Sequence, residues 1–289
     1  MHPDEVHTDV ALVRGLLAAQ FPRWAGLPVE AVASSGTVNA LYRLGTQMVV
    51  RLPRTDWAPG AMARQMRWLP TLARSLPVAV PRPIALGAPA LGYPYEWGVT
   101  SWVEGHSLVP GSVAEEGSLA RRLAEFVSVL HAIVLPGGPP QRRGSLHERW
   151  DGPTRAALDA LRGEIDTGAA TAAWEVALAA PPWAGPSVWV HGDLMPANLV
   201  VEDGVLTGVI DWEAFGVGDP AVDLMVAWNS LSSGAREIFR DAVDVDEAAW
   251  RRGRGWALCT GLVALPYYRE TNPALADNAR FRIAQVLAD

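Results

Sequence analysis

The feature that most constrains this chain is a short polar loop set inside an apolar stretch. The sequence VHGDLMPANLV, residues 190–200, places His191, Asp193 and Asn198 between two runs of apolar residues. Runs this short, bounded by glycine and proline, are typical of buried strands. We therefore predict two short strands joined by a tight loop, a position where rigid neighbours can hold chemically active side chains in place.

A second carboxylate follows this stretch at a fixed distance. A strand predicted over residues 205–210 ends at Asp211, eighteen residues beyond Asp193, and the hairpin is expected to return Asp211 to the side of the polar loop. This set suits phosphoryl transfer, because one carboxylate can orient an acceptor hydroxyl and take its proton while other oxygens bind Mg²⁺. Asp193 fits the first task, and Asn198 and Asp211 fit the second.

The periodicity of the chain changes after its first third. Apolar residues over 29–52 follow a pattern of strand, loop, strand, turn and strand, with helices predicted before them at 5–20 and after them at 61–76. Beyond residue 105 the spacing is mostly helical, beginning with a long helix over 112–135 and ending with a helical region over 220–288. The layout predicts an α+β protein with a small sheet-containing lobe and a larger helical lobe.

Composition excludes several classes of function. The chain has 24 basic and 31 acidic residues, a net charge of −7, which argues against binding to the phosphate backbone of nucleic acid. All 24 basic residues are arginine, so a mechanism that needs a lysine amine is excluded. A single cysteine, Cys259, rules out a disulfide or a cysteine-based zinc site within the chain. No membrane-length apolar run or secretory signal is evident, so we expect a cytoplasmic protein with no membrane partner.

The stretches HGDLMPANLV and VIDWEAFGVGDPAVDL together resemble the aminoglycoside phosphotransferase family, whose members share a protein-kinase-like fold. The resemblance extends over most of the chain, with SSGTVNALYRLG at the place of the nucleotide loop, VVRLPR at the third strand and TSWVEG at the hinge. It implies a two-lobed α+β fold. A small antiparallel sheet lobe over residues 1–102 would bind the nucleotide, and a larger, mainly helical lobe over residues 103–289 would carry catalysis and acceptor binding.

The resemblance also implies roles for individual residues. Asp193 would be the catalytic base, and Asn198 and Asp211 would bind Mg²⁺. His191, Asp219 and Asp223 would support the catalytic loop. The nucleotide, ATP or GTP, would be held by backbone amides of the first turn, by the third strand and by the hinge, which assigns to it Ser34, Ser35, Gly36, Thr37, Arg51, Ser101, Trp102 and Val103.

Two positions depart from the pattern of this family. The third-strand position that usually holds a lysine is Arg51, and the helix position that usually holds its glutamate partner is Gln65. Arginine can neutralise phosphate and bind it through two N–H groups at once. Glutamine can orient such a cation only through a neutral hydrogen bond. These departures are the only support for an alternative hypothesis, a catalytically inactive kinase-like binding module.

The acceptor is expected to be a small molecule with a hydroxyl group. The resemblance implies an antibiotic such as an aminoglycoside or a macrolide, and a kinase of a metabolic amino alcohol or sugar is the alternative within the same chemistry. Glu270 and Asp277, at the end of PYYRE and beyond it, are candidates for acceptor binding. An acidic cleft built from residues after 230 would favour a polyamine-like acceptor, and an apolar cleft would favour a macrolide. The sequence leaves the oligomeric state open.

Overall fold

The structure is a computed structural model that describes residues 5–33, 38–56 and 59–289. The chain divides into two compact units. The first comprises Met1–Arg74, Ala79–Glu104 and Gly208–Glu213, and the second comprises Ser75–Val78, Gly105–Thr207 and Ala214–Asp289. The sequence pattern predicts a single boundary after residue 102, whereas the first unit extends to Glu104 and also takes in residues 208–213. One reason is that the amide of Val209 donates to the carbonyl of Ala79 at 2.9 Å.

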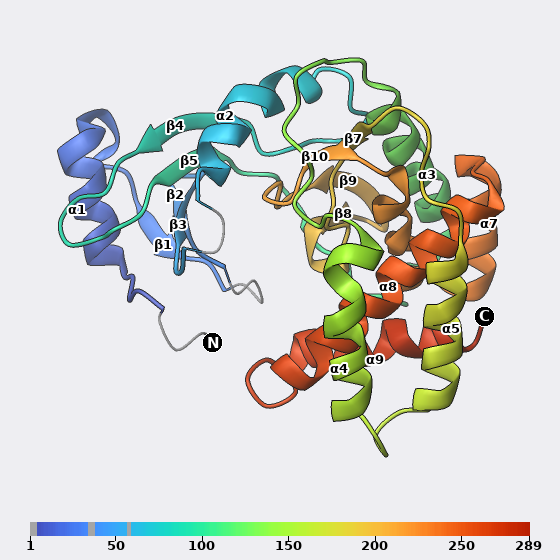
Figure 1. Ribbon diagram of the computed structural model, residues 1–289. Coiled ribbons are helices and arrows are strands. Elements are labelled where there is room, and N and C mark those ends of the chain that lie inside the picture. Colours follow the sequence, from blue (N-terminus) through green and yellow to red (C-terminus); the bar gives the residue numbers. More distant parts are fainter. Residues whose placement is uncertain (1–4, 34–37, 57–58) are drawn as a thin grey trace. The chain divides into compact units, whose positions relative to one another are not determined.

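The first unit is built on a five-stranded antiparallel sheet in the order β1-β2-β3-β5-β4 (Figure 1). Its helices are α1 and α2, with a short 3₁₀ turn after α1. In chain order the elements are α1 (Val10–Gln20), η1 (Pro22–Trp24), β1 (Val29–Ala31), β2 (Asn39–Leu44), β3 (Met48–Pro53), α2 (Ala61–Leu72), β4 (Pro83–Gly87) and β5 (Trp97–Ser101).

The two faces of β3 have different surroundings, which decides where its polar residue points. Val50 and Leu52 join the apolar core of the first unit, together with Leu16 of α1 and Trp97 of β5. Because side chains alternate along a strand, Arg51 points to the opposite face of the sheet. There it is 5% exposed and lies against α2, so this charged side chain needs partners within the protein.

The second unit is mainly helical and carries two small sheets (Figure 1). β7 (Val188–Val190) pairs with β10 (Gly216–Gly218), and β6 (His106–Ser107), β8 (Leu199–Glu202) and β9 (Val205–Val209) form the other sheet. Its helical elements in chain order are α3 (Glu116–Ala132), η2 (Leu146–Trp150), α4 (Asp151–Ala160), α5 (Thr167–Ala179), η3 (Pro196–Asn198), η4 (Pro220–Met225), α6 (Val226–Ser230), α7 (Ser233–Val243), α8 (Glu247–Tyr268) and α9 (Pro273–Leu287).

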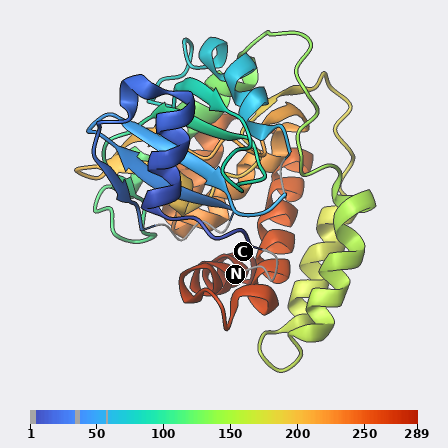
Figure 2. The same cartoon turned by 90° about the vertical axis from the view of Figure 1, so that its left-hand side faces the viewer.

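The helix α8 is the centre of the helical packing, because it contacts α4, α5 and α9 as well as η4. Figure 2 shows α4 and α5 lying side by side. Buried tryptophans fill this unit, among them Trp174, Trp228 and Trp256. Among the described residues, no helix is both long and apolar enough to cross a bilayer. The antiparallel sheet of the first unit and the helices of the second confirm the predicted α+β class.

Candidate active site

The polar loop lies between β7 and β8, where the sequence pattern predicts it. β7 ends at Val190, and Gly192 then turns the chain with φ +79°, a conformation that strains any residue with a Cβ atom. The 3₁₀ turn η3 closes the loop before β8. His191 and Asn198 are buried, whereas 28% of the Asp193 side chain is exposed. Of these three predicted site residues, Asp193 is the most exposed to solvent.

Asp223 holds the backbone of this loop through hydrogen bonds from its amides. Its carboxylate is fully buried and accepts the amide of His191 at 2.9 Å and the amide of Gly192 at 2.8 Å. The ring Nε2 of His131 on α3 lies 3.1 Å from the same carboxylate. The ring Nδ1 of His191 in turn accepts the amide of Asp193 at 3.2 Å. A buried carboxylate with these donors holds the chain on both sides of the turn at Gly192.

Asn198 connects the two ends of the loop. Its Nδ2 donates to the backbone carbonyl of Asp193 at 2.8 Å and lies 3.4 Å from the carboxylate Oδ2. This bond identifies the carbonyl Oδ1 as the atom that the amide could offer to a cation. A neutral carbonyl oxygen is a suitable Mg²⁺ ligand, so the chemistry of Asn198 fits its predicted role.

Asp219 does not touch the loop directly but holds the element that carries Asp223. Its side chain caps η4 by accepting the amide of Ala221 at 2.9 Å. The same carboxylate binds both Nε and Nη2 of Arg252 on α8, at 2.8 and 3.2 Å. Asp219 therefore anchors the start of η4 to α8 through a bidentate ion pair.

Arg143, which the sequence reasoning missed, binds the carboxylate of Asp193. Its Nη2 forms an ion pair with Asp193 Oδ1, and its Nε donates to the carbonyl of Gly192 at 2.9 Å. Arg143 lies fifty residues before Asp193, in the segment GGPPQRRG. No spacing rule connects two positions so far apart in the chain, so nothing in the sequence signals this pair.

A second guanidinium, that of Arg282 on α9, lies beneath the loop. It is buried, and its Nη1 donates to Thr260 Oγ1 at 3.1 Å and lies 3.3 Å from Met195 Sδ. Burial lowers the pKa of Arg282 to about 10, and the charge of Asp193 opposes this shift. Burial also raises the pKa of the Cys259 thiol to about 12, so the one cysteine of the chain is not a nucleophile at neutral pH.

In the first unit, Arg51 forms ion pairs with the predicted metal ligand Asp211 and with Glu213. Its Nη2 lies 3.0 Å from Asp211 Oδ1 and 3.1 Å from Glu213 Oε1, and its Nη1 lies 3.4 Å from Gln65 Oε1. Glu213, which the sequence reasoning missed, also accepts the side-chain amide of Asn39 at 2.5 Å. Glu213 follows Asp211 by two residues in IDWE, and this position alone does not indicate its contact with Arg51.

Asp211 has an uncommon backbone conformation, with φ +62°. Residues other than glycine seldom adopt this left-handed region, and they are frequent at functional positions when they do. Because 37% of its side chain is exposed, the Asp211 carboxylate can still bind a cation while Arg51 contacts one of its oxygens. By its contacts Asp211 belongs to the first unit.

The predicted hinge is tied into the sheet of the first unit. The amide of Ser101 donates to the carbonyl of Arg82 at 2.8 Å, and the amide of Trp102 donates to that of Gln47 at 2.8 Å. Of the three predicted hinge residues, Ser101 and Trp102 thus have amides that are bonded within the first unit. The predicted phosphate loop, residues 34–37, lies outside the described residues.

Comparison with a family model decides the classification. Residues 30–288 match the model of the phosphotransferase enzyme family. The chain belongs to this family. The matched region includes the polar loop, Arg51 with its partners and the hinge, so it covers every residue of the candidate site discussed above.

Two curated relatives carry antibiotic phosphotransferase names. The chain is 35% identical over 134 residues to viomycin phosphotransferase from Streptomyces vinaceus, which covers 41% of this chain and 46% of the relative. It is 33% identical over 115 residues to an aminoglycoside 3'-phosphotransferase from Escherichia coli, covering 38% of this chain and 42% of the relative. The matched stretches thus span less than half the length of these relatives.

Solved structures of phosphotransferases share the fold over nearly the whole chain. A GDP complex of an aminoglycoside 2'-phosphotransferase-IIIa variant matches with a TM-score of 0.75 and 18% identity, covering 97% of this chain and 98% of that one. The apoenzyme of a macrolide 2'-phosphotransferase from Brachybacterium faecium matches with a TM-score of 0.59 and 25% identity, covering 95% and 97%. These matches confirm the predicted kinase-like fold class.

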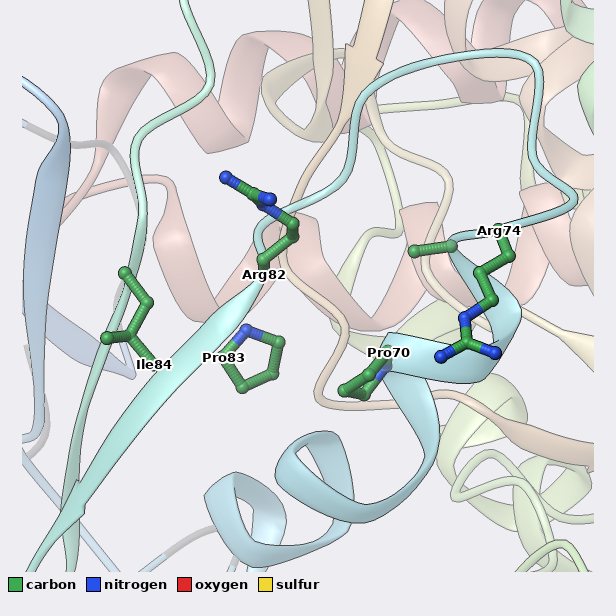
Figure 3. A pocket seen from close by; sticks show the side chains of 6 residues that line it. Pro70, Arg74, Arg82, Pro83 and Ile84 are labelled. Atoms are coloured by element: carbon green, nitrogen blue, oxygen red, sulfur yellow. The ribbon is translucent and has the colours of Figure 1, made fainter.

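The remaining predicted site residues lie on the surface of the second unit. Glu270 is exposed in the turn between α8 and α9, and Asp277 on α9 is exposed and paired with Arg280 at 3.1 Å. Figure 3 shows side chains that line a surface hollow of the first unit, near the end of α2 and the start of β4. The hollow has a volume of about 590 Å³, and none of the predicted site residues lines it. Within the described residues, no group of three or more His, Cys, Asp or Glu side chains is arranged to hold a metal. Mg²⁺ commonly takes only one or two protein carboxylates beside substrate phosphates, which matches the donor types of Asn198 and Asp211.

Proposed function

We propose that this chain transfers the γ-phosphate of ATP or GTP to a hydroxyl group of a small molecule. The observation that carries the proposal is the placement of Asp193, a partly exposed carboxylate on a loop whose backbone is bound by Asp223 and Asn198. Phosphoryl transfer depends mainly on positioning and charge neutralisation. A carboxylate held in this way would orient the acceptor hydroxyl and take its proton.

Binding of nucleotide and Mg²⁺ is assigned to the residues that match the motifs of the family. The backbone of residues 34–37, Arg51 and the hinge at Val103 would hold the nucleotide, while Asn198 and Asp211 would hold Mg²⁺, which neutralises phosphate charge when bound. The two carboxylates beside Arg51 support an active enzyme over an inactive binding module. They supply the negative charge that Gln65 lacks, so the departures at these two positions do not leave a buried charge unpaired.

The acceptor is proposed to be an antibiotic, since the named relatives act on viomycin and aminoglycosides and one structural match on macrolides. Several acids of the second unit are already paired with arginine. Glu164 pairs with Arg269 and Arg280, Glu247 pairs with Arg240 and Arg251, and Asp151 pairs with Arg155. An acceptor amine would therefore bind acids other than these.

The test is release of nucleoside diphosphate with Mg²⁺ and ATP or GTP across aminoglycosides, macrolides, peptide antibiotics and amino alcohols. We expect acceptor-dependent release with at least one class, and Asp193→Ala is expected to lower kcat by about 10²- to 10⁴-fold, because a positioned base is lost. Asp241→Ala, which removes an exposed carboxylate from α7, is the matched control and should leave turnover unchanged. Release that does not depend on Asp193 would overturn the assignment of the base.

A further inference from the structure

The segment that carries Arg143 is packed onto the strands that carry the catalytic loop. The amide of Gln141 donates to the carbonyl of Val217 at 3.0 Å, and the amide of Val217 donates to that of Pro139 at 2.8 Å. Residues 139–143, here called the strap, therefore extend the β7–β10 ribbon by one more strand-like segment. Since β7 runs directly into the polar loop, the strap and Asp193 share one rigid support.

Glycine makes this close packing possible. A Cβ atom at Gly216 of β10 would lie 2.6 Å from both the backbone nitrogen of Gln141 and the carbonyl oxygen of Pro139. Backbone atoms cannot yield to such an overlap as a flexible side chain can. The sequence of β10, Gly-Val-Gly, thus fits the strap against the ribbon at backbone contact distance.

Both the backbone and the side chain of Arg143 are held in place. The backbone carbonyl accepts a hydrogen bond from Trp150 Nε1 at 2.8 Å, and the guanidinium lies 5.7 Å from the centroid of the Trp150 ring. Nε donates to the Gly192 carbonyl while Nη2 binds Asp193 Oδ1, so the guanidinium spans two neighbouring residues of the loop. A planar, forked cation held in this way fixes Oδ1 relative to the backbone carbonyl of Gly192, which leaves Oδ2 as the oxygen that Arg143 does not bind.

We infer that Arg143 is a positioning residue for Asp193, an inference that rests on the proposed function. It occupies Oδ1, whereas the nearest described donor to Oδ2 is Asn198 Nδ2 at 3.4 Å. Arg143 therefore turns Oδ2 toward the acceptor hydroxyl, and Oδ2 receives the proton as the acceptor oxygen bonds to the transferred phosphorus and the bond to the nucleoside diphosphate breaks. The transition state of phosphoryl transfer is loose, so the acceptor needs only a weak base to take its proton. The orientation of the Asp193 carboxylate therefore matters more than the basicity that it loses by pairing with Arg143.

The pair also bears on acceptor choice. A carboxylate that already faces a guanidinium offers little net charge to an incoming ammonium group. Arg282 adds a second cation within range of Asp193. An acceptor is thus recognised at Asp193 as a hydroxyl group and not as a cation.

The experiment measures steady-state kinetics of Arg143→Ala and Arg143→Lys with the acceptor that gives the highest wild-type turnover. We expect Arg143→Ala to lower kcat by about 30-fold or more while the KM for nucleotide stays within about twofold, because orientation at the reacting oxygen is lost and nucleotide binding is not. Guanidinium ion added at millimolar concentration should restore part of the lost kcat of Arg143→Ala. Arg143→Lys keeps the positive charge but lacks the forked guanidinium, so its kcat should lie between those of the wild type and Arg143→Ala.

Arg149→Ala is the matched control for the strap. Arg149 is exposed and its Nη1 donates to the carbonyl of Arg142 at 2.8 Å, so its loss removes one arginine bond from the same segment without touching Asp193. Its kcat should equal that of the wild type. Equal losses in Arg149→Ala and Arg143→Ala, or no rescue by guanidinium, would assign Arg143 a merely structural role and overturn the inference.

Thermal unfolding gives a second measurement that does not need turnover. If the ion pair forms, the Tm loss of the double variant Asp193→Ala with Arg143→Ala is smaller than the sum of the two single losses. Additive losses would overturn the pair itself. Wild-type protein without acceptor-dependent turnover would overturn the proposed function, whereas wild-type turnover that Arg143→Ala leaves unchanged would overturn this inference alone.

Discussion

At the scale of single residues, a buried guanidinium at Arg51 determines which acids must surround it. Burial of an unpaired charge is costly, and the structure supplies two carboxylates, those of Asp211 and Glu213, where one glutamate on a helix would be the familiar solution. Gln65 still lies on the face of α2 that meets Arg51, but it contributes only a neutral contact at 3.4 Å. The negative charge that pairs with Arg51 thus comes from the segment after β9 and not from α2.

This assignment makes Glu213→Gln informative. Glutamine keeps the shape of the side chain but removes its charge, so we expect a loss of about 1–3 kcal/mol in the free energy of unfolding, because a buried charged hydrogen bond is weakened. The KM for nucleotide should rise, since Arg51 loses one of the groups that orient it. Chemical denaturation and steady-state kinetics measure the two effects.

The double variant Gln65→Glu with Glu213→Gln is the matched control, because it returns the carboxylate to α2. If Glu213 acts as the counter-ion of Arg51, the double variant recovers the unfolding free energy lost by Glu213→Gln. Recovery of stability without recovery of kinetics would give Glu213 a further role toward the nucleotide. A single variant as stable as the wild type would contradict the assignment.

Among the elements, the polar loop is supported by the β7–β10 ribbon, whose strands are short. β7 and β10 each contribute three residues, and the strap adds its backbone bonds on the outer side of β10. Below the ribbon, η4 delivers Asp223 to the amides of His191 and Gly192, and Arg252 of α8 secures η4 through Asp219. Few residues lie in regular strands here, so side-chain bonds carry much of the support.

Gly216→Ala tests the strap at this scale. The added methyl group would overlap backbone atoms of the strap at 2.6 Å, so we expect destabilisation of about 1–3 kcal/mol from overpacking, together with a fall in kcat as Arg143 moves away from Asp193. Gly234→Ala is the control, because a Cβ atom there meets nothing within 4 Å. Denaturation and kinetics that match between the two variants would show that the strap does not press on β10.

Across the whole chain, the features that the sequence predicts are those set by residues close together in the chain. The α+β class follows from the change of periodicity after the first third, and the loop with Asp193 and Asn198 follows from polar residues between two apolar runs. Asp223 could be associated with the loop only through the family resemblance. Its buried bonds to the loop backbone depend on the fold of η4, which no local pattern encodes.

Arg143 and Glu213 were not predicted for different physical reasons. Arg143 reaches Asp193 through pairing of the strap with β10, a contact between segments far apart in the chain. Glu213 lies two residues after Asp211, and its role becomes visible only once Arg51 is known to be buried on the same face. The unit boundary was similarly hidden, because residues 208–213 join the first unit by tertiary contacts alone.

If phosphate moves from the nucleotide to a hydroxyl group with Asp193 at the acceptor, the product identifies the reaction. The measurement is mass spectrometry and phosphorus NMR of the acceptor after incubation with Mg²⁺, nucleotide and either wild-type protein or Asp193→Ala. We expect a phosphomonoester on one acceptor hydroxyl with the wild type and unchanged acceptor with the variant. Inorganic phosphate with unmodified acceptor, or a phosphomonoester formed equally well by Asp193→Ala, would contradict it.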